Sequence, residues 1–299
     1  MYNICCIGHI TLDKVVTKRS VVHMAGGTSF YFSNALSNMK LRYLLITSLA
    51  KKEMHFIDDL REVGIRVHVP AFSEHTVYFE NNYAEDQDHR TQRVIRKGDP
   101  FTVEQLENAE AEIFHLGPLL ADDFPVEVIK LLSEKGKVSL DVQGYLRKVE
   151  NKKVFAVDWP AKKQALQYVH ILKANEYEME ALTGCTDVRK GAKILFDWGV
   201  KEIAITLGSR GSVIYDGNHF YNIPAYSPIT SVVDATGCGD TYMAGYLYMR
   251  SKGSGFRNAG EFAAAMATLK IESSGPFTGT ETDVLALLEN AKERTEFGI

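Results

Sequence analysis

Short apolar runs alternate with longer segments of helical periodicity along most of this chain. The apolar runs predict strands at Ile4–Gly8, Tyr43–Thr47, Glu112–Leu116, Lys137–Asp141, His170–Lys173 and Glu202–Thr206. Apolar residues that recur three and four positions apart predict helices over Ser29–Met39, Glu53–Val63, Asp123–Lys135, Val188–Trp198, Gly239–Lys252 and Phe256–Ser273. Such alternation is typical of a mostly parallel sheet with helices on both faces, so we expect an α/β fold. Because the chain has no repeat or long linker, we expect one domain over residues 1–299.

Two segments, at about residues 14–24 and 75–97, break this alternation. The second contains two predicted strands, Thr76–Asn82 and Arg90–Arg96, which the acidic turn at 85–88 joins. Because polar residues lie on both faces of this hairpin, it would sit poorly in a core. A β-lid that projects over a polar ligand explains the pattern, and a surface hairpin or a dimer contact is the alternative.

Composition excludes several classes of protein. The chain is 45% hydrophobic and 24% charged, with a net charge of −4, which argues against general nucleic-acid binding. Its apolar runs are too short to cross a bilayer, and its first residues lack the basic start and cleavage site of a signal peptide. The four cysteines, at positions 5, 6, 185 and 238, show no metal-ligand spacing and no disulfide framework. We therefore expect free thiols and a cytoplasmic protein.

The stretch Asp234–Asp240, Asp-Ala-Thr-Gly-Cys-Gly-Asp, stands at the start of a predicted helix. Glycines in such a turn leave backbone N–H groups aimed at one point, where the helix dipole favours an anion. Asp240 would lie within reach of a group that attacks this anion, which is the arrangement that phosphoryl transfer to a hydroxyl needs. The alternative is ordinary: an aspartate at a helix N-terminus is often only a cap, and a glycine-rich turn is often only a tight turn.

Two further motifs follow predicted strands. Asn175 and Glu178 could direct a polar pair at a magnesium–phosphate group, although Asn and Glu at this spacing also form a capping box. Thr206, Gly208 and Gly211 belong to a Thr-Leu-Gly-Ser-Arg-Gly loop whose glycines could let the backbone approach a nucleotide. This loop lacks the Gly-Lys-Ser/Thr ending of a Walker A motif, and it could equally be a plain connection between strands.

Ligands in open parallel sheets gather beyond the carboxyl ends of the strands. Asp13, Asp141, Asn175 and the segment 115–118 follow predicted strands and therefore face the expected site, although a lone aspartate in a loop is more often merely solvated. The pair Gly26–Gly27 precedes a predicted helix. It could allow a substrate to approach closely, or it could be a turn into a helix capped by the next residues.

Taken together and in order, these motifs resemble those of the PfkB/ribokinase family of carbohydrate kinases along nearly the whole chain. The stretch Asp234–Asp240 is similar to the late Asp-Thr-x-Gly-Ala-Gly-Asp signature of that family. The pair Asn175 and Glu178 is similar to its Asn-x-x-Glu motif, and the loop at 206–211 is similar to its nucleotide loop. Gly26–Gly27 resembles its early Gly-Gly element.

The resemblance implies a ribokinase-like three-layer αβα sandwich with a small β-lid, and a kinase that uses ATP. By this analogy Asp240 is the general base that takes the proton from a substrate hydroxyl. The backbone of three residues would stabilise charge on the transferred phosphoryl group: Gly237, Cys238 and Gly239. Asn175 and Glu178 would help to hold magnesium (Mg²⁺), directly or through water.

The remaining roles also come from the resemblance. Thr206, Gly208 and Gly211 would line the nucleotide site, and Asp234 would lie near a monovalent-cation site that potassium (K⁺) occupies in many members. The substrate would contact Asp13, Gly26, Gly27 and Asn34. The expected partners are a small sugar or polyol and ATP, with no nucleic acid and no membrane. A homodimer through the lid follows by the same analogy.

Two positions depart from the family pattern. The early signature usually places an Asn four residues after its second glycine, where this chain has Tyr31, and Asn34 lies one helical turn further on. Tyr31 and the sequences of segments 141–147 and 79–83 make the chain more similar to inositol-kinase-like members of the family than to ribose or fructose kinases. Cys238 stands where the family usually has alanine, and a thiol at a helix N-terminus can have a lowered pKa. We therefore expect alkylating agents to modify Cys238, the alternative being an unreactive buried side chain.

Three other functions compete with a sugar or polyol kinase. A nucleoside kinase of the same fold would need stacking aromatic residues, which Phe30, Tyr31 and Phe32 could supply. A catalytically silent metabolite-binding regulator could share the fold, although the intact Asp240 argues against it. A dinucleotide-dependent dehydrogenase is excluded because no Gly-x-Gly-x-x-Gly follows the first strand.

Overall fold

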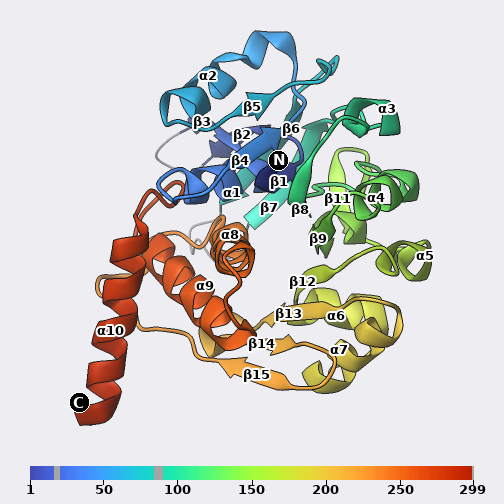
Figure 1. Cartoon of the computed structure of the whole chain (residues 1–299). Coiled ribbons are helices and arrows are strands. Elements are labelled where there is room, and N and C mark those ends of the chain that lie inside the picture. The colour runs from blue at the N-terminus through green and yellow to red at the C-terminus, as the bar shows by residue number, and fades with distance from the viewer. Residues whose placement is uncertain (17–20, 84–89, 298–299) are drawn as a thin grey trace.

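The computed structural model describes residues 1–16, 21–83 and 90–297, and a twisted central sheet runs through the molecule (Figure 1). Within the described residues this sheet has nine strands in the order β15-β14-β13-β12-β9-β8-β1-β4-β5. Seven neighbouring strands are parallel, and β14 and β15 complete one edge in antiparallel pairing. The strands are β1 (Tyr2–Ile7), β4 (Tyr43–Ile46), β5 (Val67–His68), β8 (Ala111–Leu116), β9 (Lys137–Asp141), β12 (Ile171–Asn175), β13 (Glu202–Thr206), β14 (Ser212–Tyr215) and β15 (Phe220–Ile223).

Helices cover both faces of the central sheet (Figure 1). One face carries α1 (Thr28–Leu36), α2 (His55–Glu62), α8 (Cys238–Ser251), α9 (Phe256–Ile271) and α10 (Glu281–Phe297). The other carries α3 (Val103–Leu106), α4 (Val126–Ser133), α5 (Lys162–Leu166), α6 (Glu176–Thr183) and α7 (Val188–Asp197). Each face buries its own apolar cluster, because the central strands bury side chains on both faces. The expected three-layer αβα sandwich is therefore confirmed.

A second sheet forms the expected β-lid. It has six strands in the order β10-β11-β7-β6-β2-β3 within the described residues, and its apolar face packs on Leu119 and Leu120. The strands are β2 (Thr11–Val16), β3 (Val21–Gly26), β6 (Val77–Tyr83), β7 (Arg90–Arg96), β10 (Arg147–Glu150) and β11 (Lys153–Ala156). The sequence predicted the hairpin of β6 and β7 but not β10 and β11. The acidic turn at 85–88 and residues 17–20 of the first lid segment lie outside the described residues.

Local sequence explains where several elements begin and end. Helix α6 begins with a capping box, and Gly184 ends it in the left-handed conformation with a φ of 71°. Helix α4 begins at Val126 rather than at Asp123, because Pro125 precedes it and Asp123 binds a loop instead. Short 3₁₀ turns at 51–53, 142–146 and 208–210 complete the connections. No helix in the described part of the chain is long and apolar enough to cross a bilayer.

Candidate active site

The site lies where the carboxyl ends of the central strands meet the N-termini of α1 and α8. Helix α8 begins after Gly237, which takes a left-handed φ of 77° and so turns the chain into the helix. The Cys238 N–H donates to the Ala235 carbonyl (3.2 Å), and the Thr241 N–H donates to the Gly237 carbonyl (2.9 Å). The first-turn N–H groups of Gly239 and Asp240 precede this helical hydrogen bonding. They therefore provide the positive end of a helix for an anion.

Asp240 is half-buried at this helix start. Desolvation and the nearby Asp141 carboxylate together raise the pKa of its carboxyl to about 6. Three groups lower this pKa and favour the carboxylate: the Lys173 ammonium, the Thr28 hydroxyl that donates a hydrogen bond, and Arg147. A carboxyl with a pKa near neutrality is suited to accept a proton during a reaction.

A buried lysine, which the sequence analysis did not single out, lies beside Asp240. Lys173 is 5% exposed, and its Nζ donates to Asp141 Oδ2 (2.8 Å) and lies 3.9 Å from a carboxylate oxygen of Glu178. A Cβ at position 239 would lie 3.2 Å from Nζ, so the glycine there lets the ammonium approach the helix start. Burial lowers the pKa of Lys173, but the surrounding carboxylates outweigh it and hold the pKa above its usual value. The detectable signal was a lysine at the end of an otherwise apolar strand.

Asn175 and Glu178 form the capping box that the sequence allowed. The Asn175 side chain accepts from the Glu178 N–H (2.8 Å), and the Glu178 carboxylate accepts from the Asn175 N–H (2.7 Å). Burial raises the pKa of Glu178, and Lys173 acts against this rise. The reciprocal hydrogen bonds thus hold Asn175 and Glu178 in position beside Lys173.

The donor set fits a magnesium ion that arrives with phosphate. Among the described residues, no group of three or more His, Cys, Asp and Glu side chains could hold a metal. Magnesium commonly binds through one or two carboxylates, water and substrate phosphates, so such a cage is not required. Glu178 and Asp141 are the carboxylates beside the anion position that could serve it.

Asp13, on lid strand β2, faces the glycine pair. The Thr11 hydroxyl donates to Asp13 Oδ1 (2.6 Å). A Cβ at Gly26 would lie 2.5 Å from Asp13 Oδ2, and a Cβ at Gly27, which has a φ of 87°, would lie 2.8 Å from the His9 carbonyl oxygen. Both glycines are therefore needed to seat α1 and Asp13 together.

Tyr31 and Asn34 lie on α1, where the family pattern is broken. The Tyr31 ring packs against Gly237 at the start of α8 and is 5% exposed. The Asn34 side chain donates to the Phe30 carbonyl within the helix (2.9 Å). Tyr31 thus reaches the anion turn, whereas a substrate contact by Asn34 stays a prediction.

The predicted nucleotide loop follows β13. Thr206 pairs with Asn175 across the two strands, which places the loop beside the capping box. Gly208 and Gly211 have φ values of 59° and 86°. A Cβ at Gly211 would overlap the Ile223 carbonyl oxygen, while Gly208 faces open space. The fold of the loop therefore requires a glycine at position 211, apart from the predicted contact with a nucleotide.

Asp234 begins the turn that leads to α8. Its Oδ1 accepts from the Thr236 N–H (2.9 Å), and its carbonyl oxygen accepts from the buried ammonium of Lys270 (2.8 Å). The same region contains Cys238, whose thiol lies 3.8 Å from the Ala267 carbonyl. Burial raises the pKa of Cys238 to about 11, which corrects the expectation of a lowered pKa. At this site desolvation outweighs the helix dipole.

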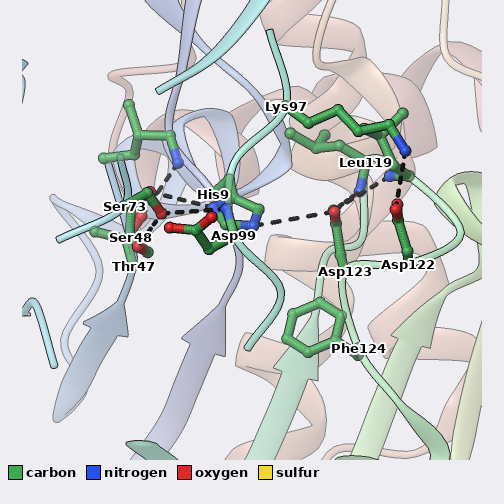
Figure 2. Close-up of polar contacts among 12 residues, drawn as sticks. His9, Thr47, Ser48, Ser73, Lys97, Asp99, Leu119, Asp122, Asp123 and Phe124 are labelled. Carbon is green, nitrogen blue, oxygen red and sulfur yellow. Dashed lines mark hydrogen bonds and ion pairs between the residues drawn. The ribbon is translucent and has the colours of Figure 1, made fainter. Parts of the chain in front are cut away.

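A second buried polar cluster stands at the ends of β1, β4 and β8 (Figure 2). His9 Nδ1 lies 3.2 Å from the Ser48 carbonyl oxygen, and His9 Nε2 lies 3.9 Å from Asp123 Oδ1. Asp123 Oδ2 accepts from the N–H groups of Leu119 (2.7 Å) and Leu120 (3.1 Å). Because the lid packs on these leucines, the cluster fixes the base of the lid.

Comparisons with known proteins show the family to which the chain belongs. A family model for pfkB family carbohydrate kinases matches residues 1–283. The chain is 27% identical over 266 residues to a cytidine kinase of Thermococcus kodakarensis, which covers 85% of this chain and 90% of that protein. It is 29% identical over 178 residues to a ribokinase of Arabidopsis thaliana, which covers 57% of this chain and 44% of that protein.

Solved structures show the same fold. A pyrophosphate-dependent kinase in the ribokinase family, complexed with a pyrophosphate analog and myo-inositol, has a TM-score of 0.84 at 31% identity, over 95% of this chain and 99% of that one. The Arabidopsis thaliana ribokinase complexed with ribose and ATP has a TM-score of 0.79 at 21% identity, over 96% and 99%, and bears on the fold alone. The protein is therefore a kinase that belongs to the pfkB family of carbohydrate kinases.

Proposed function

We propose that this kinase transfers the terminal phosphoryl group of ATP to a hydroxyl of a small polyol or sugar, with Asp240 as the general base. The observation that carries the proposal is that the half-buried Asp240 lies beside the buried Lys173 at the N-terminus of α8. A proton acceptor, a fixed cation and the first-turn N–H groups of α8 meet there. Phosphoryl transfer depends mainly on such positioning and charge neutralisation.

The reaction balances with these groups. The acceptor O–H bond breaks as its proton moves to the Asp240 carboxylate. The acceptor oxygen forms a bond to the terminal phosphorus, and the bond from phosphorus to the bridging oxygen breaks, so that ADP leaves with the electron pair. The first-turn N–H groups of Gly239 and Asp240 and the Lys173 ammonium offset charge on the transferred group, because the Cys238 N–H already donates to the Ala235 carbonyl. Magnesium, held by Glu178 and Asp141 with Asn175 beside it, would supply further neutralisation of phosphate charge.

The lid supports an acceptor with several hydroxyls. By strand alternation Asn81 lies on the same face of β6 as the buried Val77 and Phe79, and Asn81 is itself 5% exposed. Gln92 Nε2 on β7 donates to Asn81 Oδ1 (3.0 Å), and Phe79 pairs in register with Asp13. An amide pair and a carboxylate on one face suit a polyhydroxylated ring. The similar structure with bound myo-inositol favours this class, and the similar cytidine kinase keeps a nucleoside as the second candidate.

The phosphoryl donor has two candidates. Ile229, Val232 and Val233 expose apolar side chains on the segment just before Asp234, which suits the face of a purine base. The similarity to a pyrophosphate-dependent kinase favours inorganic pyrophosphate as the second candidate, because pyrophosphate needs only the anion turn and the cations. ATP is the first candidate donor, because the exposed apolar segment before Asp234 suits its base. Pairing of two copies through the lid stays a prediction.

A matrix of donors and acceptors tests the proposal. Purified protein with magnesium would be incubated with ATP or pyrophosphate and a panel of inositols, pentoses, hexoses and nucleosides, and the phosphorylated product would be measured. We expect turnover on a polyol or sugar with ATP, and a loss of about 10²–10⁴-fold in Asp240→Asn. Turnover in Asp240→Asn within a few-fold of the unaltered protein would contradict the general-base assignment.

A further inference from the structure

A fully buried lysine outside the phosphoryl site holds the turn that forms it. Lys270 lies in the last turn of α9 and is 0% exposed. Lysine is almost never fully buried without partners, because burying its charge is costly. The groups around its ammonium therefore have to compensate for the lost water.

Three oxygen atoms surround the ammonium. Nζ donates to the Asp234 carbonyl oxygen (2.8 Å) and the Ser273 carbonyl oxygen (3.4 Å), and it lies 3.5 Å from Asp234 Oδ2. An ammonium has three donors, so these oxygens match its capacity. The N–H groups of Val233 and Asp234 also donate to the Ile271 carbonyl oxygen, at 2.8 and 3.3 Å. The end of α9 and the chain before α8 are thus joined around one positive charge.

This arrangement is the kind that binds a monovalent cation. Backbone carbonyls and a carboxylate are hard oxygen ligands of the type that alkali cations take, and Asp234 is the residue at which the sequence analysis expected potassium. The oxygens do not fit potassium here, because the lysine ammonium already uses them. A second cation beside Nζ would be repelled by the positive charge of the ammonium.

We propose that the Lys270 ammonium takes the place of a monovalent cation, so that this kinase needs no potassium. Lys270 is then a positioning residue. Through Asp234 it fixes the turn that ends at Gly237 and presents the N–H groups of α8. The Asp234 Oδ1, which accepts from the Thr236 N–H, carries this restraint into the turn.

The first test replaces potassium by sodium or tetramethylammonium during turnover, at constant ionic strength. We expect the rate of the unaltered protein to change by less than about twofold. Lys270→Ala should lose at least about tenfold in kcat, equivalent to about 1.4 kcal/mol, and potassium or ammonium ions should restore most of the loss. The matched control is Lys252→Ala, because Lys252 is exposed and pairs with Glu281 away from the turn. Its rate should stay independent of the cation.

A second readout does not depend on the acceptor or donor. The thermal midpoint of Lys270→Ala should rise with potassium concentration, because an ion that binds only the folded state stabilises it. The midpoint of the unaltered protein should not respond to potassium beyond its response to sodium. This readout remains valid even if the proposed substrates are wrong.

Three results would overturn the proposal: a requirement of the unaltered protein for potassium, full activity of Lys270→Ala without small cations, or a loss that neither potassium nor ammonium ions restore. If Lys270→Ala does not fold, Lys270→Gln replaces it. The cation dependence of the unaltered protein decides the question in either case.

Discussion

At the scale of single residues, the negative charge of the Asp240 carboxylate is disfavoured by its surroundings in the folded protein. Burial raises the pKa of Asp240 from 3.8 to about 6. Suppose that folding raises the pKa of a carboxyl. At a pH below its pKa in the unfolded state, the group does not destabilise the fold. As the pH rises through its pKa in the folded state, the group becomes charged and the free energy of unfolding falls. The gap of about two pKa units corresponds to about 3 kcal/mol above pH 7. The proposed role of Asp240 as the base is thus opposed by stability.

Asp240→Asn should therefore stabilise the protein while it removes activity. The amide keeps an acceptor for the Thr28 hydroxyl but carries no charge to bury. We expect its free energy of unfolding at pH 7.5 to exceed that of the unaltered protein by about 1–3 kcal/mol, and the gain to shrink towards pH 4.5. Urea unfolding at both pH values measures this. The exposed Asp58→Asn should change stability by less than about 0.5 kcal/mol. A variant less stable at pH 7.5 would refute the account of Asp240.

Single residues divide into those that local sequence predicts and those that it does not. The capping pair at 175 and 178 is a local pattern, and the structure has it as the sequence predicted. Lys173 was not singled out, because its role comes from Asp141 and Asp240, which are distant in sequence. The pKa of Cys238 was predicted in the wrong direction, because helix position is readable from sequence and depth of burial is not.

At the scale of elements, strand β3 ends at Gly26, which lies in close contact with the Asp13 carboxylate. An alanine Cβ there would lie 2.5 Å from Asp13 Oδ2 and 2.9 Å from Thr11 Oγ1, so the Asp13 carboxylate would have to move. We expect Gly26→Ala to raise KM for the acceptor by about tenfold or more, the equivalent of about 1.4 kcal/mol, with KM for the donor little changed.

Steady-state kinetics with each substrate varied in turn measure this effect. Gly255→Ala is the matched control, since a Cβ at Gly255 meets nothing within 4 Å and its φ of −64° suits alanine. An acceptor KM that stays unchanged in Gly26→Ala would show that Asp13 does not contact the acceptor.

The elements with strong periodicity were the predictable ones. The six strands predicted for the central sheet and the six predicted helices all appear, within three residues of the expected ends. Strands β10 and β11 escaped prediction, because each is only four residues long. The pairing of β11 with β7, and of β10 with β11, fixes their place, and no local pattern reveals this pairing.

At the scale of the whole molecule, the site is made where three layers meet the lid. The central sheet supplies Asp141 and Lys173, α8 supplies Asp240, and β2 of the lid supplies Asp13 (Figure 1). The Figure 2 cluster joins the sheet to the loop on which the lid packs. The order of motifs along the chain predicted this convergence only by resemblance, because the distances between the parts are set by tertiary packing.

The pH dependence of turnover tests the central claim most directly. With donor saturating, kcat/KM for the acceptor should be constant above about pH 7 and fall about tenfold per pH unit below about 6, because the Asp240 carboxylate must be unprotonated to accept a proton. The residual turnover of Asp240→Asn, with the same donor, controls for titration of the donor phosphate and should lack this limb. A profile of the unaltered protein that stays level down to pH 5, or one that Asp240→Asn reproduces, would contradict the assignment of Asp240 as the base.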